Sequence, residues 1–272
     1  DSRFQPQRFC LLFAVTGGFM TKTSGFAFAV LISLILNLHA ESGGYQEWLK
    51  RRDALKQDKS VVRYYTFEDV KDSKSIVKDL GGSGADLTFV PYKDLKTGEV
   101  FDDLQVTEGR WPAKKAVRLN RGWYQGLPAD IKNKQFTVEI WFRKNGVGSL
   151  NPYPSERGFI ISSPPGWGAG WRIETGYTPT QWMSFDIGIE KNNIRATSEK
   201  MYTDKMWHYL AATWDGRDMR LYVNGTLAAS HEYTGEYFPG TEPFKIGYRS
   251  GTSILLDVDE VVIYDRVLSA EE

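Results

Sequence analysis

Hydrophobic and polar side chains alternate with a period of two over much of the chain that follows residue 60, which is the pattern of half-buried β-strands. The alternation predicts short strands over residues 61–67, 136–143, 181–189, 207–214, 219–223, 226–230, 244–248 and 253–264. Turn signals separate several of these segments, and Asn224-Gly225 predicts a two-residue hairpin because both residues accept positive φ angles. Many short strands with little helix predict an all-β fold, a two-sheet antiparallel sandwich.

The segment before residue 41 has the pattern of a targeting signal. Residues 26–36 are eleven uncharged, mostly apolar residues, too few for a comfortable transmembrane helix of about 20. They predict the core of a signal peptide, with Lys22 as its positive flank and Ala40 as the last residue before cleavage. A membrane anchor is the alternative, and in both cases the rest of the protein leaves the cytoplasm.

An amphipathic helix is expected between the signal and the strands. Tyr45, Trp48 and Leu55 recur at helical spacing among charged residues over 45–58, which predicts about three turns that pack against the sandwich or lead into it. The expected organisation is therefore an upstream extension with a signal peptide (1–40), a helical lead-in (41–60) and one β domain (61–272).

The composition of the chain limits which binding partners and which cellular compartment are expected. The chain has 34 basic and 34 acidic residues, so no overall field attracts it to nucleic acid, and no membrane partner is expected beyond the signal segment. Cys10 is the single cysteine, which excludes an intramolecular disulfide. Export without disulfides favours a bacterial extracytoplasmic protein, secreted or at the cell surface.

Two stretches resemble a known family. Residues 207–230 read WHYLAATWDGRDMRLYVNGTLAAS, and residues 255–272 read LLDVDEVVIYDRVLSAEE. They resemble the central hairpin and the closing strand of laminin-G-like, concanavalin-A-like jelly-roll domains. Residues 64–69 and 136–146 resemble an opening and a middle strand. The resemblance implies a jelly roll with about six or seven strands in each sheet, and an extracellular binding module of which some members hold calcium.

An enzyme of the same fold needs paired carboxylates. A retaining glycosidase places two of them about 5–5.5 Å apart, and the nearest candidates are Asp257 to Glu260 and Asp186 to Glu190. Strict alternation turns Glu260 away from the face of Asp257 and Asp259, and the second stretch lacks the central carboxylate. No catalytic residue is therefore predicted, and a glycosidase or polysaccharide lyase stays an alternative.

Aromatic side chains are the candidates for glycan binding, because the apolar face of a sugar stacks on a flat ring. The candidates in loops or on polar faces are Trp123, Tyr124, Trp167, Trp171 and Trp182. Each ring could instead cover the core. We predict a non-catalytic binding module for a polysaccharide or glycan, accessory to a larger secreted or surface protein. A structural or protein-interaction domain of the cell surface is the alternative.

Carboxylates near both ends of the β domain suggest a calcium site. First and last strands are often neighbours in such sandwiches, which would bring Glu68 and Asp69 to Asp259. Calcium takes six to eight oxygen ligands. Alternatively, these side chains bond to loops or to Arg266. The residues 269–272, Ser-Ala-Glu-Glu, have the spacing of a capping box, so a helix and further domains of the same chain are expected to follow.

Overall fold

The computed structural model describes residues 43–129, 131, 134–147, 158–163, 169–175, 182–189, 192–200, 202, 205–248 and 254–272. The chain divides into two compact units, Asp1–Gly43 and Gly44–Glu272, and the fold described below is that of the second. The expected signal core, residues 26–36, and Trp167 lie outside the described residues. Within the described part, no helix is long and apolar enough to cross a membrane.

Eight strands form the first sheet, called sheet 1, and all of their pairings are antiparallel. Seven follow the order β14-β13-β12-β7-β16-β5-β4, and β1 also pairs with β16. Their bounds are β1 (Val61–Tyr65), β4 (Gln105–Glu108), β5 (Lys115–Leu119), β7 (Phe136–Val147), β12 (His208–Trp214), β13 (Asp218–Val223), β14 (Thr226–Glu232) and β16 (Ile254–Tyr264).

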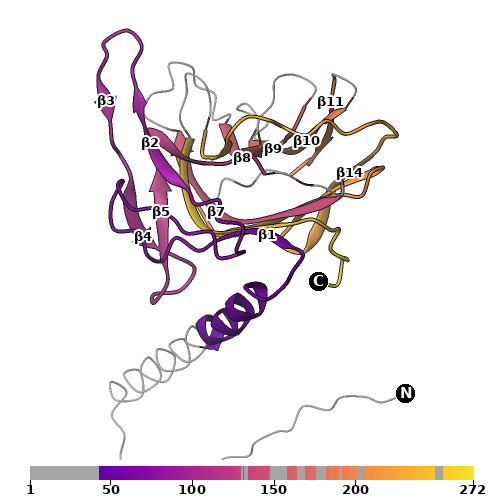
Figure 1. Ribbon diagram of the computed structural model, residues 1–272, viewed down its shortest axis with the longest axis horizontal. Helices are drawn as coiled ribbons and strands as arrows, with labels where there is room; N and C mark the ends of the chain where they lie inside the picture. The colour runs from indigo at the N-terminus through magenta and orange to yellow at the C-terminus, as the bar shows by residue number, and fades with distance from the viewer. Residues whose placement is uncertain are drawn as a thin grey trace, which may run out of the picture. The chain divides into compact units, whose positions relative to one another are not determined.

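The second sheet, called sheet 2, also has eight antiparallel strands, in the order β11-β10-β9-β8-β15-β6-β2-β3. Their bounds are β2 (Thr88–Lys93), β3 (Val100–Phe101), β6 (Gly122–Gly126), β8 (Gly158–Ser163), β9 (Trp171–Thr175), β10 (Met183–Ile189), β11 (Asn192–Thr197) and β15 (Phe244–Ile246). Figure 1 shows the two sheets as facing layers, with β8 to β11 in one and β1, β7 and β14 in the other. The predicted antiparallel sandwich is confirmed.

The core lies between the sheets and uses the predicted inward faces. Phe136, Val138, Ile140 and Phe142 of β7 are fully buried, and so are the alternate residues of β10 from Phe185 onward. Each such side chain contributes about 1.5–3 kcal/mol by leaving water. The polar residues between them therefore lie on the outer face of each sheet. Those outer faces carry the candidate sites.

The predicted hairpin is present between β13 and β14. Asn224 and Gly225 have φ angles of 52° and 75°, the left-handed values that a two-residue turn of this kind requires. The Asn224 side chain also accepts a hydrogen bond from the Tyr209 backbone N–H at 3.0 Å. The turn therefore fixes the register of β12, β13 and β14 at this end of sheet 1.

The strand β16 has an unusual set of neighbours. It pairs with β7 along one side, while β5 and β1 share its other side: β5 pairs with residues 256–258 and β1 with residues 261–264. The register shifts between Val258 and Glu260, which marks a β-bulge. Asp259 and Glu260 therefore lie at the junction between the two partner strands.

A helix spans residues 43–55 and packs on the outer face of sheet 1, which confirms the predicted amphipathic helix with both boundaries two or three residues earlier. Its Trp48 is 3% exposed, and its Leu55 joins a small apolar cluster with Tyr64 and Val262 of the sheet. The helix is therefore part of the folded domain and covers one region of sheet 1.

Candidate ligand-binding faces

Polar side chains from seven neighbouring strands form one continuous row across the outer face of sheet 2. Cross-strand pairing places each directly opposite the next, and buried core residues lie on the inner face in the same strands. In strand order from β2 to β11, the row is Thr88, Gln125, Lys245, Ser162, Arg172, Asp186 and Arg195.

Carboxylates and guanidinium groups balance one another at the β9–β11 end of this row. Asp186 accepts hydrogen bonds from Arg172 Nη2 at 2.8 Å and from Arg195 Nη2 at 2.6 Å. We call Arg172, Asp186 and Arg195 the sheet 2 triplet. Glu174, two residues after Arg172 in β9 and on the same face, accepts from Arg195 Nη2 at 2.8 Å and lies 4.0 Å from Arg172. Among the described residues, two carboxylates thus face two guanidinium groups.

Half-buried aromatic rings stand at both ends of the row. The guanidinium carbon of Arg195 lies 5.1 Å from the ring centroid of Trp182. At the other end, Trp123 meets Tyr248 edge-to-face at 4.8 Å between centroids, and the Lys245 ammonium lies 4.1 Å from the Tyr248 ring. Burial lowers the pKa of Lys245 below its ordinary value. The outer face of sheet 2 therefore presents two of the five predicted aromatic candidates.

Two other predicted aromatics lie in the core, so their prediction as ligand-stacking rings was wrong. Tyr124 is fully buried, and Trp171 is 1% exposed, with its ring centroid 5.8 Å from that of Phe136. Both belong to strands in which neighbouring residues alternate between faces. The adjacent Trp123 and Arg172 take the outer positions, so Tyr124 and Trp171 must point inward.

The carboxylates predicted for calcium do not come together as a metal site. Asp259 is fully buried and accepts from Lys114 Nζ at 2.7 Å and from the Arg110 backbone N–H at 2.8 Å. Glu68 instead faces Arg52, and Asp69 is exposed. Among the described residues, no three His, Cys, Asp or Glu side chains are grouped to hold a metal. Asp259 forms ion pairs with the Lys114 ammonium and the Arg110 guanidinium. Because these two cations already neutralise it, the predicted residues do not fit calcium.

Glu260 does not point away from Asp259 as strict alternation predicted. The Arg110 side chain donates to both, to Asp259 Oδ1 from Nε at 3.2 Å and to Glu260 Oε2 from Nη2 at 2.5 Å. The β-bulge between Val258 and Glu260 is the physical reason, because an extra residue in one strand interrupts the alternation of faces. One guanidinium therefore serves two consecutive carboxylates.

The same cluster holds the helix of residues 43–55 to sheet 1. Glu260 accepts from Trp48 Nε1 at 2.9 Å and from the Tyr64 hydroxyl at 2.7 Å. Arg51 donates to Glu139 at 2.7 Å, and its other terminal nitrogen lies 3.8 Å from Glu260. The network is internally paired and covered, so its role is to anchor the helix.

The pKa of Glu260 reports this environment. Burial alone would raise it, but the positive charges of Arg110, Arg51 and Lys114 outweigh burial and hold the pKa below its ordinary value. The carboxylate is therefore ionised in the folded protein at neutral pH.

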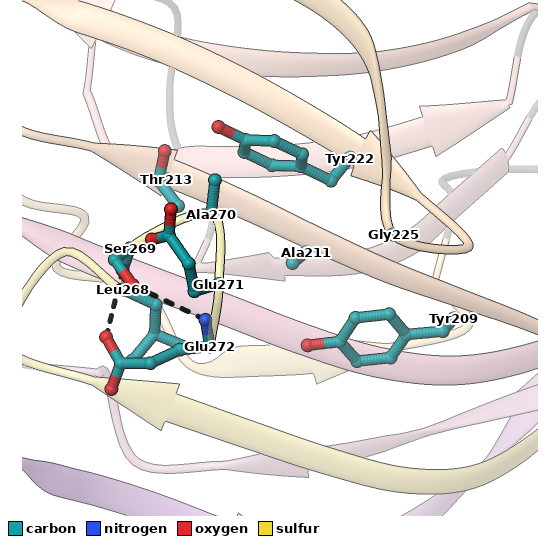
Figure 2. A pocket seen from close by; sticks show the side chains of 10 residues that line it. All are labelled: Tyr209, Ala211, Thr213, Tyr222, Gly225, Leu268, Ser269, Ala270, Glu271 and Glu272. Carbon is teal, nitrogen blue, oxygen red and sulfur yellow. Dashed lines mark hydrogen bonds between the residues drawn. The ribbon is translucent and has the colours of Figure 1, made fainter. Parts of the chain in front are cut away.

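A small pocket of about 180 Å³ lies on the outer face of sheet 1. Figure 2 shows it between Tyr209 and Tyr222 of the sheet and the segment 268–272. Ser269 N donates to the Glu272 carboxylate, and Glu272 N donates to Ser269 Oγ, which are the two reciprocal bonds of the predicted capping box. Ligand pockets commonly measure about 300–1,000 Å³, so this one is small for an oligosaccharide.

Comparison with known proteins agrees with the fold. Residues 122–272, more than half of the chain, match Laminin_G_3 of the concanavalin A-like lectin/glucanases superfamily. The chain belongs to this family.

The curated relatives are much longer proteins. The chain is 29% identical over 160 residues to human (Homo sapiens) pappalysin-1 and 27% identical over 154 residues to the mouse (Mus musculus) protein. These matches cover 54% and 53% of the chain, but 10% and 9% of the relatives. The chain thus spans about a tenth of the proteins that it matches.

Solved structures with the same fold include binding domains. Domain 4 of AbnA, a GH43 extracellular arabinanase from Geobacillus stearothermophilus, in complex with arabinotriose, matches with TM-score 0.56 and 16% identity over 78% of this chain and 95% of that one. The binding domain of botulinum neurotoxin DC in complex with SialylT matches with TM-score 0.55 and 15% identity over 78% and 49%. These likenesses are of fold.

Proposed function

We propose that this chain is a lectin-like module that binds a glycan on the outer face of sheet 2. The polar row with Trp182 near one end and Trp123 near the other is the observation that carries the proposal. Flat rings suit the apolar faces of sugars, and the partly exposed amide of Gln125 and guanidinium groups of Arg172 and Arg195 can pair with sugar hydroxyls, whereas Ser162 and Asp186 of the row are buried. Among the described residues, the charges of the sheet 2 triplet and Glu174 balance, which favours a neutral saccharide at this end of the row.

The surroundings of the candidate carboxylates support a module without catalysis. Asp257 is held by two arginines, Asp259 by Lys114 and Arg110, and Asp186 by the two arginines of its triplet. A retaining glycosidase needs one carboxylate free to attack and another that holds a proton. Cations at hydrogen-bond or ion-pair distance already occupy oxygens of each of these carboxylates.

Family membership supports the same proposal. We infer that the module acts outside the cytoplasm as part of a larger secreted or surface protein. Domain 4 of an extracellular arabinanase, in complex with arabinotriose, is one such arrangement on this fold. An origin in bacteria stays a prediction from the sequence.

A glycan array followed by calorimetry tests the proposal. We expect binding to at least one neutral polysaccharide, weakened roughly tenfold or more by Trp182→Ala, because a stacked ring contributes on the order of 1–3 kcal/mol by analogy with base stacking. Tyr222→Ala, a half-buried aromatic on sheet 1, is the matched control and should leave binding unchanged.

Two results would contradict the proposal. The first is no binding to any glycan by a folded protein, and the second is equal weakening by the two variants. Capture of a cell-envelope protein without any effect of sugars would replace it with the structural or protein-interaction alternative.

A further inference from the structure

A second row of charged residues crosses the outer face of sheet 1, away from the proposed glycan face. Cross-strand pairing places Asp257 of β16 between Arg118 of β5 and Arg143 of β7. We call these residues the sheet 1 triplet. Asp257 is fully buried and accepts from Arg118 Nε and Nη2 at 2.6 and 2.9 Å, and from Arg143 Nε and Nη2 at 2.8 and 2.7 Å. The Arg118 contact is bidentate, with one nitrogen on each carboxylate oxygen, whereas both Arg143 nitrogens contact Oδ2.

This triplet carries one net positive charge. Among the described residues, neither arginine has another carboxylate within 4.0 Å. The side chains of Arg118 and Arg143 are 31% and 23% exposed, so they are partly shielded but open to solvent. Each uses its Nε–Nη2 edge on Asp257, which leaves the Nη1 donors for another acceptor.

An aromatic ring supports one of the two arginines. The guanidinium carbon of Arg143 lies 4.6 Å from the ring centroid of Trp207, which is half-buried. A guanidinium held by a carboxylate on its edge and a ring on its face loses little further entropy on binding. The triplet is therefore preorganised as well as positively charged.

We propose that the sheet 1 triplet is a second binding site, which receives the carboxylate or sulfate group of an acidic saccharide. Guanidinium groups match the geometry of such oxyanions. The site is separate from the neutral-saccharide face on sheet 2, and only the assignment of the ligand as a saccharide rests on the proposed function.

Titration calorimetry with three short probes tests the site: tetragalacturonate, a sulfated maltotetraose and neutral maltotetraose. In Arg118→Gln, Asp257 keeps Arg143 as its partner, so the variant should fold while the triplet becomes neutral. We expect the affinity for an acidic probe to fall at least about tenfold, the effect of losing one charge-assisted contact. Whichever acidic probe binds more tightly identifies the anionic group.

Arg220→Gln is the matched control for overall charge. Arg220 lies on the same sheet, is 34% exposed and pairs with Asp215 and Asp218, so its loss removes an equal charge without touching the triplet. It should leave acidic-probe affinity unchanged. Equal weakening by the two variants, or no binding of either acidic probe to the wild type, would overturn the proposal.

Asp257→Asn gives a test with the opposite sign. It raises the net charge of the triplet, so an acidic probe should raise the unfolding temperature of this variant more than that of the wild type. A smaller rise would count against the site. Trp182→Ala separates the two proposals: acidic-probe affinity that survives it supports a site on sheet 1, whereas its loss would assign both ligands to sheet 2.

Discussion

Sheets 1 and 2 each carry an arginine–aspartate–arginine triplet on their outer face, and the two triplets differ in what surrounds them. In sheet 2, Glu174 contacts both arginines of the triplet in addition to Asp186. In sheet 1, Asp257 is the single carboxylate within 4.0 Å of its two arginines among the described residues. Counted over the part of the chain that the structure describes, the same cross-strand pattern therefore gives a neutral cluster on one face and a positive cluster on the other.

The outer face of sheet 1 is also partly covered by a helix. Sheet 1 is covered in part by the helix of residues 43–55, anchored through the buried cluster of Asp259 and Glu260. Charge pairs that are sealed from water become costly to break, whereas pairs open to water cost little. Removing an outer-face charge should therefore lower the free energy of unfolding more when the charge is buried, and less when its partner keeps a second ion pair.

The largest effect is expected at Asp259. Asp259→Asn leaves the fully buried Lys114 ammonium without a carboxylate within 4.0 Å among the described residues, and breaking such a pair costs about 4 kcal/mol. Urea denaturation measures the loss, with Asp69→Asn, an exposed carboxylate, as the control near zero. A loss under about 1 kcal/mol at Asp259 would show that the cluster does not anchor this face.

The two triplets should differ when each loses its aspartate. Asp257→Asn leaves two arginines with no carboxylate and should cost about 3 kcal/mol. Asp186→Asn leaves Glu174 in contact with both of its arginines, so about half of that loss is expected. Equal losses in parallel denaturation curves would remove the distinction between a positive and a neutral triplet.

Glu260→Gln should cost about 2 kcal/mol at pH 7, because hydrogen bonds to a charged acceptor are replaced by neutral ones. The pKa of Glu260 is lowered in the folded state from 4.5. Its charge therefore stabilises the fold above pH 4.5, and this contribution is lost as the pH falls through the folded-state pKa. The difference between wild type and variant should narrow on acidification below pH 4.5. A difference that widens there would contradict the assigned charge network.

The smallest effect is expected at Arg220. It pairs with Asp218 at 2.6 Å and with Asp215 at 3.5 Å, and the side chains of both aspartates are partly exposed. Arg220→Gln should change the free energy of unfolding by less than about 0.5 kcal/mol. A larger loss would show that partly exposed pairs on sheet 1 are as important as the triplet.

Part of this picture follows from the sequence alone. A period of two places Arg143 and Asp186 on outer faces and their apolar neighbours in the core, and the structure confirms both. Their partners could not be predicted, because a triplet depends on the register of three strands. Arg172 and Arg195 lie in β9 and β11, short strands that the alternation did not reveal.

The errors have equally local causes. The sequence predicts Tyr124 and Trp171 in loops or on polar faces because its pattern does not reveal β6 and β9, and without a strand there is no alternation to decide which face a ring takes. Glu260 was misplaced because a bulge has no signature in the pattern of hydrophobic residues. The cations that pair with Asp259 are Arg110 and Lys114, which lie in the connection between β4 and β5. Only the tertiary fold brings this connection close to β16.

The position of β16 between β1, β5 and β7 has a consequence for folding. Val61 pairs with Tyr264, so one of the central ladders of sheet 1 joins residues about 200 positions apart, and such non-local pairing is slow to form. During synthesis, β1, β5 and β7 would wait with unpaired edges until β16 leaves the ribosome. Unpaired edges invite association with other chains. The interval before β16 arrives is therefore when this protein is most exposed to aggregation and has most to gain from a chaperone.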